Sequence, residues 1–370
     1  MIASEAWLLG LKTADLNDVL TGTERTSLRP TKAGLLAGLC VPDCGQPQLR
    51  FFADFLSLLI IADVRIKRVG NVSDSVEHGA ASQSGIDSLG QHDLRPELQR
   101  LISRADSSWD TRFAGSVHSY HSAQLQVITA RLHNVTPDLD TYLLLRRDLS
   151  GFQMFLDLVE LSENLTIVSA ADETSQRLTI LKQLTADIIG CSLVNTSVNP
   201  SISISLNSCQ DVFAFNNDQA QGNRHNLITI LMVDRHLSLQ GALNFAGVMI
   251  RQMFDSFVEI QQSLFSPSTP PYANHPGSGT LSACWKWITS TRLATPPALT
   301  HWPPPTNLEY GGDLASDLPS YVRTLRDCIV GTINWAYETE LYFGRKGEEI
   351  RTFGWVFLNP KVIGDSEDQA

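Results

Sequence analysis

Residues 210–226, QDVFAFNNDQAQGNRHN, carry the residue types and spacing in this chain that could do chemistry. If the stretch is helical, Gln210, Ala214 and Asp218 follow one another at intervals of four and share one face. An amide oxygen and a carboxylate on one face are hard ligands of the kind that Mg²⁺ prefers, whereas Ala214 cannot ligate a metal. Gly222 predicts the end of this helix.

Charged candidates occur at two further places. Asp63 follows an apolar helical pattern and is itself followed by the cations Arg65 and Lys67. A lone aspartate at a helix end is more often a solvated surface group than a metal ligand. Arg146 and Arg147 are adjacent, and the planar fork of an arginine suits bidentate binding of diphosphate oxygens. The alternative is a solvated arginine pair at a helix end.

The residues around the three ligand positions of the first stretch carry a family resemblance. They are Asp211, Phe215, Gln219, Ala220, Gly222, His225 and Asn226. Together they resemble the second metal motif of class I terpene synthases, of the fungal, basidiomycete type. That motif has Asn, Ser and Glu where this chain has Gln210, Ala214 and Asp218, so the metal motif is degenerate. The resemblance extends in family order over residues 30–66, 109–190, 210–264 and 318–358.

The resemblance implies a metal site built from two motifs. Asp63 occupies the place of the family's first, aspartate-rich cluster, although Arg65 and Lys67 stand where further acids would belong. With Gln210 and Asp218 it forms the implied ligand set for Mg²⁺, of which active members bind three ions.

The resemblance also implies a set of diphosphate-binding residues. Arg147 takes the place of the diphosphate-sensing arginine, and Gly151, four residues on, lies at the implied helix break. Tyr342 keeps one half of the Arg-Tyr pair with which the family touches the diphosphate, and Leu341 replaces the arginine. Arg345 lies nearby and could substitute for it in part. Arg147 and Tyr342 are therefore the implied catalytic residues, and Arg345 a further substrate-binding residue.

The expected fold is all-α, a single-domain helical bundle of residues 1–370 around a central apolar cavity. Helical patterns are predicted on either side of Pro42, over residues 94–105, 109–132, 152–161, 176–189, 227–232 and 237–264, and over 318–340. Residues 68–92, 192–209 and 265–313 are predicted to be loops or insertions because they are rich in Ser, Gly, Asn or Pro. A retained intron in the gene model is an alternative explanation for residues 192–209 and 265–313.

Composition limits the partners of the chain. A net charge of −11 argues against nucleic acid, and the most apolar window, residues 55–64, is too short to span a bilayer. The six cysteines lack zinc or redox spacing and are expected to be reduced thiols of a cytoplasmic protein, with no signal peptide evident. We expect a small prenyl diphosphate as the partner, and a monomer or a homodimer.

Two functions stay open. One is a Mg²⁺-dependent terpene cyclase that ionises farnesyl diphosphate, cyclises it to a sesquiterpene and releases diphosphate. The other is a catalytically impaired or inactive homologue that keeps the helices without turnover. Ala214 and Leu341 are the residues that favour the second hypothesis.

Overall fold

Every element that the computed structural model describes is a helix. It describes residues 30–68, 103, 105–163, 173–191, 210–220, 222–265, 317–353 and 358–359. The elements are α3 (Ala33–Cys40), α4 (Gln46–Arg68), α7 (Ser107–Leu132), α8 (Leu139–Leu149), α9 (Phe152–Ser162), α10 (Glu173–Cys191), α11 (Gln210–Ala220), α12 (Leu227–Asp234), α13 (Leu239–Phe265), α15 (Asp317–Glu338), α16 (Glu340–Phe343), the 3₁₀ turn η1 (Gly344–Lys346) and α17 (Gly347–Phe353).

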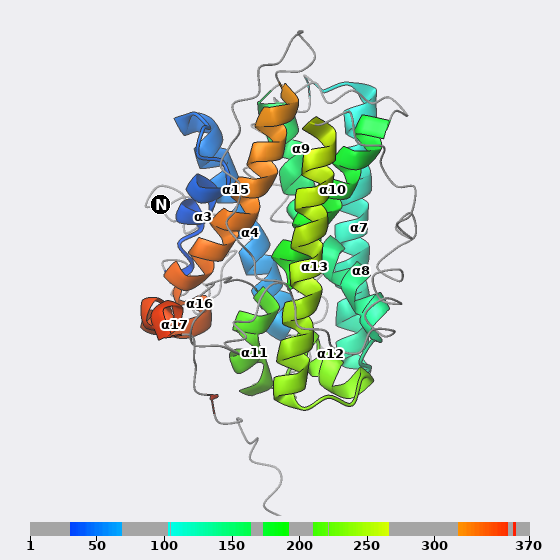
Figure 1. Cartoon of the computed structure of the whole chain (residues 1–370), viewed down its shortest axis with the longest axis vertical. Helices are drawn as coiled ribbons and strands as arrows, with labels where there is room; N and C mark the ends of the chain where they lie inside the picture. Colours follow the sequence, from blue (N-terminus) through cyan, green and yellow to red (C-terminus); the bar gives the residue numbers. More distant parts are fainter. Residues whose placement is uncertain are drawn as a thin grey trace, which may run out of the picture.

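The long helices form a bundle with the short ones gathered at one end (Figure 1). Helix α10 packs against α8, α13 and α15, and α3 packs against α4 and α15. The end of the bundle that carries α11 and α12 also carries α16 and α17, and α4 runs down to it (Figure 1). The candidate residues of the sequence, far apart along the chain, are thus carried toward the same end.

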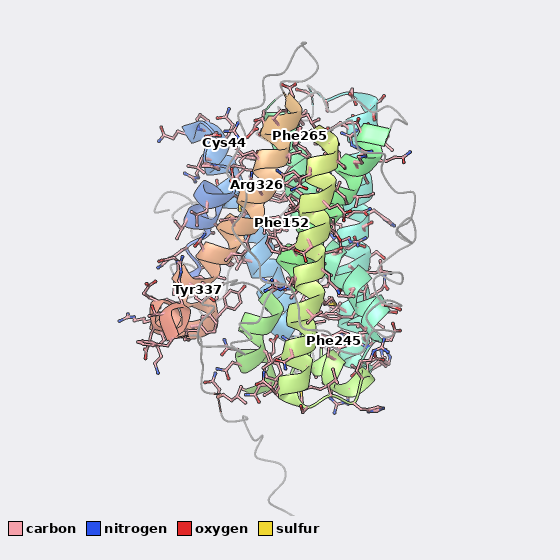
Figure 2. The ribbon with its side chains drawn as sticks, viewed as in Figure 1. Cys44, Phe152, Phe245, Phe265, Arg326 and Tyr337 are labelled. Atoms are coloured by element: carbon pink, nitrogen blue, oxygen red, sulfur yellow. The ribbon has the colours of Figure 1, made fainter. Side chains whose placement is uncertain are left out.

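The core is aromatic and aliphatic. Side chains of α13 extend from Phe245 near one end of the bundle to Phe265 near the other (Figure 2). Phe52 of α4, Phe155 of α9 and Phe257 of α13 are completely buried, and the rings of Phe52 and Phe155 meet edge to face with centroids 5.2 Å apart. Burial of such rings removes large apolar areas from water and fixes the helices relative to one another.

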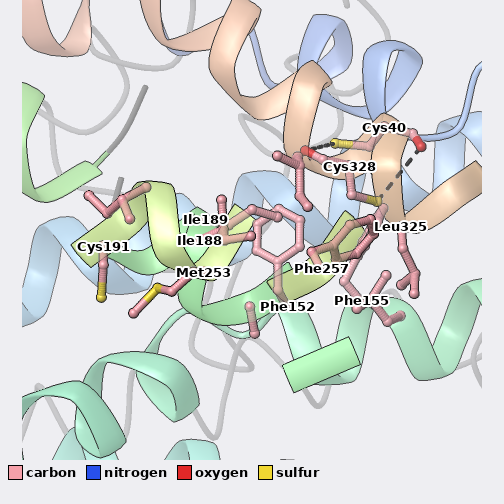
Figure 3. Close-up of a cluster of buried hydrophobic side chains, with 14 of the residues drawn as sticks. Cys40, Phe152, Phe155, Ile188, Ile189, Cys191, Met253, Phe257, Leu325 and Cys328 are labelled. Atoms are coloured by element: carbon pink, nitrogen blue, oxygen red, sulfur yellow. Dashed lines mark hydrogen bonds between the residues drawn. The ribbon is translucent and has the colours of Figure 1, made fainter. Parts of the chain in front are cut away.

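Two buried cysteines mark the close contact of α3 with α15. The thiol of Cys40 lies 3.9 Å from the carbonyl of Cys328, and the thiol of Cys328 lies 3.7 Å from the carbonyl of Cys40 (Figure 3). Gly331 permits this approach because a Cβ atom there would lie 2.7 Å from backbone atoms of Leu39. Cys40, Cys44, Cys191 and Cys328 are free thiols, as predicted, and Cys209 and Cys284 lie outside the described residues.

Side-chain caps explain where several helices begin. Asp106 accepts a hydrogen bond from the backbone N–H of Trp109 at the start of α7, over 2.7 Å. Asp138 caps α8 in the same way, and Asn226 accepts from the N–H of Ile228 to cap α12. Each cap satisfies a backbone donor that the helix itself leaves unpaired.

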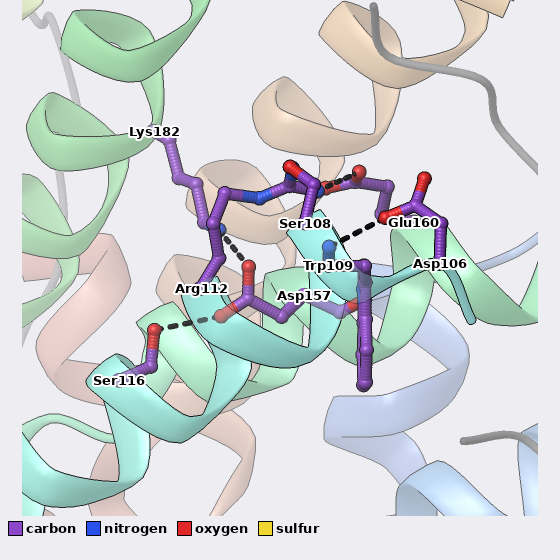
Figure 4. Close-up of polar contacts among 8 residues, drawn as sticks. All are labelled: Asp106, Ser108, Trp109, Arg112, Ser116, Asp157, Glu160 and Lys182. Carbon is purple, nitrogen blue, oxygen red and sulfur yellow. Dashed lines mark hydrogen bonds and ion pairs between the residues drawn. The ribbon is translucent and has the colours of Figure 1, made fainter. Parts of the chain in front are cut away.

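A polar cluster joins α7, α9 and α10 (Figure 4). Asp157 is fully buried, pairs with Lys182, and accepts a hydrogen bond from Ser116. Arg112 pairs with Glu160 beside it. A buried carboxylate is tolerated only when it is paired and hydrogen-bonded, so this cluster acts as a structural tie between three helices.

The predicted fold class is confirmed, and the other predicted helices match observed ones closely, but the helix predicted over residues 94–105 lies outside the described residues except for residues 103 and 105, neither of which is helical. The helices predicted over residues 152–161 and 176–189 are α9 and α10. Helix α4 continues to Arg68 and α13 to Phe265, so each takes the first residue of a segment predicted to be a loop. The rest of residues 68–92 and 265–313, and all of 192–209, lie outside the described residues. The single domain over 1–370 stays a prediction. No helix among the described residues is both long and apolar enough to cross a membrane.

Candidate active site

A small cavity lies where α4, α7, α8 and the segment after α11 meet. It holds about 20 Å³, room for roughly one water molecule. Its walls combine apolar and charged side chains: Asp63, Ile66, Val127, Arg131, Tyr142, Leu145, Arg146, Leu149 and His225. The structure thus brings the predicted ligand Asp63 together with two arginines that stand 15 residues apart in the sequence.

Arg146 is the member of the arginine pair that reaches this cavity. Its side chain is 4% exposed, and Nη1 lies 3.8 Å from Oδ1 of Asp63. Its Nε donates to the carbonyl of Gly190 in α10 over 3.2 Å. A Cβ atom at Gly190 would lie 3.3 Å from Cγ of Arg146. Because glycine has no side chain, the side chain of Arg146 can lie directly against α10 at this position.

Arg147, the predicted diphosphate sensor, is held elsewhere. Its Nε and Nη2 donate to the two carboxylate oxygens of Asp187 in α10, each over 2.6 Å. Burial alone would lower the pKa of Arg147, but the hydrogen bonds and charge of Asp187 raise it overall. Arg147 is not among the residues that line the cavity. To bind a diphosphate there it would have to leave Asp187, and its role as sensor stays a prediction.

Gly151 has the conformation that its place after the arginine pair predicts. It joins α8 to α9 with φ of 69°, in the left-handed region that only glycine adopts without strain. The helix break is therefore observed at the predicted residue.

Arg131, from the last turn of α7, connects the two predicted metal motifs. Its Nη1 donates to the carbonyl of Ile66 at the end of α4 over 2.6 Å. Its Nη2 donates to Oδ1 of Asn223, in the linker after α11, over 2.9 Å. Burial lowers the pKa of Arg131, and the negative charges of Asp63 and Asp218 counteract that effect. One cation therefore binds the chain beside each of the two predicted metal motifs.

Helix α11 is formed as predicted and ends at Ala220, just before Gly222 with its φ of 73°. Asp218 is buried, and its Oδ2 accepts a hydrogen bond from Nδ2 of Asn226 over 2.8 Å. Asn226 thus caps α12 and orients Asp218 at once. Ala214 is also buried and offers no ligand, and the side chain of Gln210 lies outside the described residues.

His225 completes the cavity wall as a neutral group. Burial, together with the positive charge of Arg131, lowers its pKa to about 4, although a hydrogen bond to the carbonyl of Val135 opposes the shift. The bond to Val135 uses one ring nitrogen, and Nδ1 has no hydrogen-bond partner. At neutral pH the imidazole therefore adds no charge to the site.

The C-terminal candidates lie on α16 and η1, next to α11. Nδ2 of Asn217 donates to the carbonyl of Leu341 over 3.1 Å, which fixes α11 to the segment that carries Tyr342. The ring of Tyr342 meets Trp335 edge to face, with centroids 6.0 Å apart. The side chain of Arg345 is 91% exposed and pairs with Glu340 at 3.8 Å. In this structure Arg345 is a surface group, away from the cavity lining.

The donor set for a metal is sparse. Nowhere in the described part of the chain do three Asp, Glu, His or Cys side chains gather closely enough to hold an ion. Asp63 and Asp218 each offer one carboxylate. Mg²⁺ is commonly held by one or two carboxylates, with water and substrate phosphates as its other ligands. Among the described residues the two acids do not form an all-protein metal cage, and their role as ligands of a cation stays a prediction.

Sequence reasoning assigned no site role to four residues of this region: Arg131, Arg146, Asp187 and His225. Two signals were available. Arg131 belongs to the pattern of α7 that resembles the family, and Gly190 lies one helical turn beyond Asp187 on α10. A glycine on a buried helix indicates that a large neighbour passes closely, and here that neighbour is Arg146.

Comparison with known proteins first defines the class. The structure of linalool/nerolidol synthase from Streptomyces clavuligerus aligns with a TM-score of 0.59 and 15% identity, covering 90% of this chain and 94% of that one. An α-eudesmol synthase structure aligns at 0.53 with 16% identity, covering 90% and 92%. The fold is therefore the all-α fold of terpene synthases.

The sequence comparisons agree with this fold. A family model described as terpene synthase family 2, C-terminal metal binding, matches residues 89–256. Sesquiterpene synthase Agr1 of Cyclocybe aegerita is 27% identical over 358 residues, 92% of this chain and 83% of the relative. Alpha-muurolene synthase of Coprinopsis cinerea is 26% identical over 360 residues, 92% and 69% respectively. Residues 89–256 thus match a terpene synthase metal-binding domain model, and most of the chain is similar to fungal sesquiterpene synthases, in agreement with the resemblance of its motifs.

Proposed function

We propose that the chain is a sesquiterpene cyclase that acts on farnesyl diphosphate with Mg²⁺. The observation that carries the proposal is that one arginine, Arg131, binds the chain beside both acids, through the carbonyl of Ile66 three residues after Asp63 and through Oδ1 of Asn223 five residues after Asp218. The two acids stand 155 residues apart in the sequence, so only the fold brings their segments together. The names of the relatives from Cyclocybe aegerita and Coprinopsis cinerea support a sesquiterpene as product.

The charged residues would act on the diphosphate end of the substrate. Arg146 and Arg131 supply two buried or part-buried cations beside the cavity, and Tyr342 is proposed as a further contact. Asp63 and Asp218 would hold Mg²⁺, which as a Lewis acid stabilises the leaving diphosphate. The bond between the first prenyl carbon and the diphosphate oxygen breaks, and both electrons leave with that oxygen.

Apolar side chains beside the charged ones would protect the carbocation that remains. Ile66, Val127, Leu145 and Leu149 line the cavity with Tyr142, and at about 20 Å³ this cavity would have to widen to admit a fifteen-carbon chain. Such a surface excludes water that would quench the cation, and an aromatic face attracts positive charge. Ring closure followed by loss of a proton to the released diphosphate would then give a neutral hydrocarbon. We also propose a cytoplasmic location, in agreement with the four free thiols.

A second candidate is an impaired homologue without turnover. It is favoured by Ala214, which removes a ligand, by Leu341, which removes an arginine, and by the pairing of Arg147 with Asp187. Such a protein would keep the helical fold and lack the reaction.

Diphosphate release from farnesyl diphosphate by the full chain tests the proposal, with MgCl₂ or with chelator, while volatile products are analysed in parallel. Metal-dependent release with a cyclic hydrocarbon supports the enzyme. A folded, helical sample without release supports the impaired homologue. The double reversion Ala214→Ser with Leu341→Arg is the matched control, because it should raise activity if the remaining site is intact.

A further inference from the structure

Asn359, far from α11 in the sequence, is bound by three amide side chains of that helix. Its backbone N–H donates to Oδ1 of Asn216 over 2.6 Å, and its carbonyl accepts from Nε2 of Gln219 over 2.7 Å. Its side-chain amide donates to Oδ1 of Asn217 over 3.1 Å. We call these four residues the amide clasp. Both backbone polar groups of Asn359 and its side-chain donor are thus bound by about one turn of α11.

Asn217 extends the amide clasp to α16. Its Oδ1 accepts from Asn359, while its Nδ2 donates to the carbonyl of Leu341 over 3.1 Å and lies 3.5 Å from the carbonyl oxygen of Tyr342. An asparagine side chain has one acceptor oxygen and one donor nitrogen, so both ends of this amide are used. One side chain therefore joins α11, α16 and the segment at Asn359.

Helix α11 is short enough to depend on such contacts. It has 11 residues, and an isolated helix of this length is marginally stable in water. It packs against α10, α12 and α16, and Asp218 is bound to Asn226. The amide clasp binds the residues on either side of Asp218 in the sequence, so it holds the turn on which this acid stands.

The sequence after Asn359 favours the conformation that the amide clasp needs. Pro360 follows it, and a residue before proline is biased toward an extended backbone. In an extended backbone the N–H and the carbonyl have no partner within their own segment and are available to a neighbouring element.

We infer that the amide clasp positions α11, so that Asn359, together with Asn217 and Gln219, sets the placement of the helix that carries Asp218. The inference rests on the proposed function only for the role of Asp218 as a ligand. The coupling of Asn359 to α11 is measurable in a chain without turnover.

Hydrogen–deuterium exchange of the purified full chain, measured peptide by peptide, tests the inference. Asn359→Pro removes the backbone N–H and the side-chain amide together, and peptides covering α11 should exchange about tenfold faster than in the wild type. Asn359→Ala keeps both backbone bonds and should have a smaller effect. Peptides of α13 should be unchanged in both variants, which separates loosening of α11 from general destabilisation. Gln240→Ala, which removes an exposed amide bond to Asn244 within α13, is the matched control and should leave α11 unchanged.

Variants of Gln219 test the same coupling from the side of the helix. Gln219→Glu cannot donate to the carbonyl of Asn359 and should speed exchange in α11, whereas Gln219→Lys keeps a donor and should restore slow exchange. Added to Asn359→Pro, Gln219→Glu should have little further effect, because the segment is already released. Fully additive effects would overturn the inference.

Turnover gives an independent measurement. If the wild type releases diphosphate from farnesyl diphosphate, Asn359→Pro should lower kcat with KM little changed, and an unchanged kcat would overturn the positioning role. Unchanged exchange of α11 in Asn359→Pro would overturn the inference whether or not the chain turns over. Faster exchange of α11 in a chain without turnover would refute the proposed function and leave the positioning of α11 by the amide clasp standing.

Discussion

Removal of Arg147 should leave a buried carboxylate without a counter-ion. The side chain of Asp187 is 4% exposed and that of Arg147 19%, and two N–O contacts of 2.6 Å join them. Breaking a buried pair by removing one partner costs about 3–5 kcal/mol because the other charge is left uncompensated. Since Arg147 is partly exposed, we expect Arg147→Met to lower the free energy of unfolding by about 3 kcal/mol.

The loss of unfolding free energy in Arg147→Met should depend on pH, because Asp187 is buried. Burial raises the pKa of Asp187, and Arg147 opposes that shift. In Arg147→Met the pKa of Asp187 must rise further. The penalty is then full above this raised pKa and is relieved as the pH falls toward the ordinary value of 3.8, because the carboxyl takes up a proton in the folded state. The difference from the wild type should therefore shrink at acidic pH.

Urea unfolding followed by far-UV circular dichroism, at several pH values, measures both effects. The double variant Arg147→Met with Asp187→Leu is the matched control, since it removes both charges and should recover most of the lost stability. A loss below about 1 kcal/mol in Arg147→Met, independent of pH, would show that Arg147 does not compensate Asp187. The arginine would then be available for the diphosphate, as the sequence predicted.

Three further predictions concern stability. Gly331→Ala should cost about 1–3 kcal/mol in urea unfolding because its Cβ would lie 2.7 Å from the backbone of α3; Gly38→Ala, with nothing within 4 Å, should be neutral or stabilising. Because burial lowers the pKa of His225 to about 4, lowering the pH from 7 to 4 should destabilise the wild type by up to about 3 kcal/mol more than His225→Gln; equal pH slopes would contradict this. Lys182→Met should lower the thermal midpoint by isolating Asp157, and Asp157→Asn in the same chain should restore part of it.

The fold was predictable because helical periodicity and the order of the motifs agree. Spacing alone located α9, α10, α12 and α13 to within a few residues. Helix ends were less predictable except where a glycine marks them, as at Gly151 and Gly222. The cap residues Asp106 and Asp138 could also have been found, because an aspartate immediately before a helical pattern is a common start.

The site was less predictable because neighbours in sequence separate on a helix. Arg146 and Arg147 differ by about 100° around α8, a consequence of 3.6 residues per turn. Sequence resemblance favoured Arg147, but Arg146 is the arginine that lines the cavity. The missing side chain of Gly190 leaves space for the side chain of Arg146, which donates to the Gly190 carbonyl, whereas Arg147 is hydrogen-bonded to Asp187. Only the relative placement of α8 and α10 distinguishes the two arginines, and a motif does not encode that placement.

The arginines near the cavity also change what the loss of the family's C-terminal arginine means. In the sequence, Leu341 removes one cation from the diphosphate site, and Arg345 stands on the surface. The structure adds Arg131 and Arg146 beside Asp63, so positive charge is present without Arg345. In the structure Arg146 lies 3.8 Å from Asp63, while Arg131 donates to the carbonyl of Ile66 and to Asn223. Under the proposed function, both guanidinium groups would have to turn from these partners toward the diphosphate. An active enzyme and an impaired homologue would differ in that step, and the diphosphate-release assay with and without MgCl₂ distinguishes them.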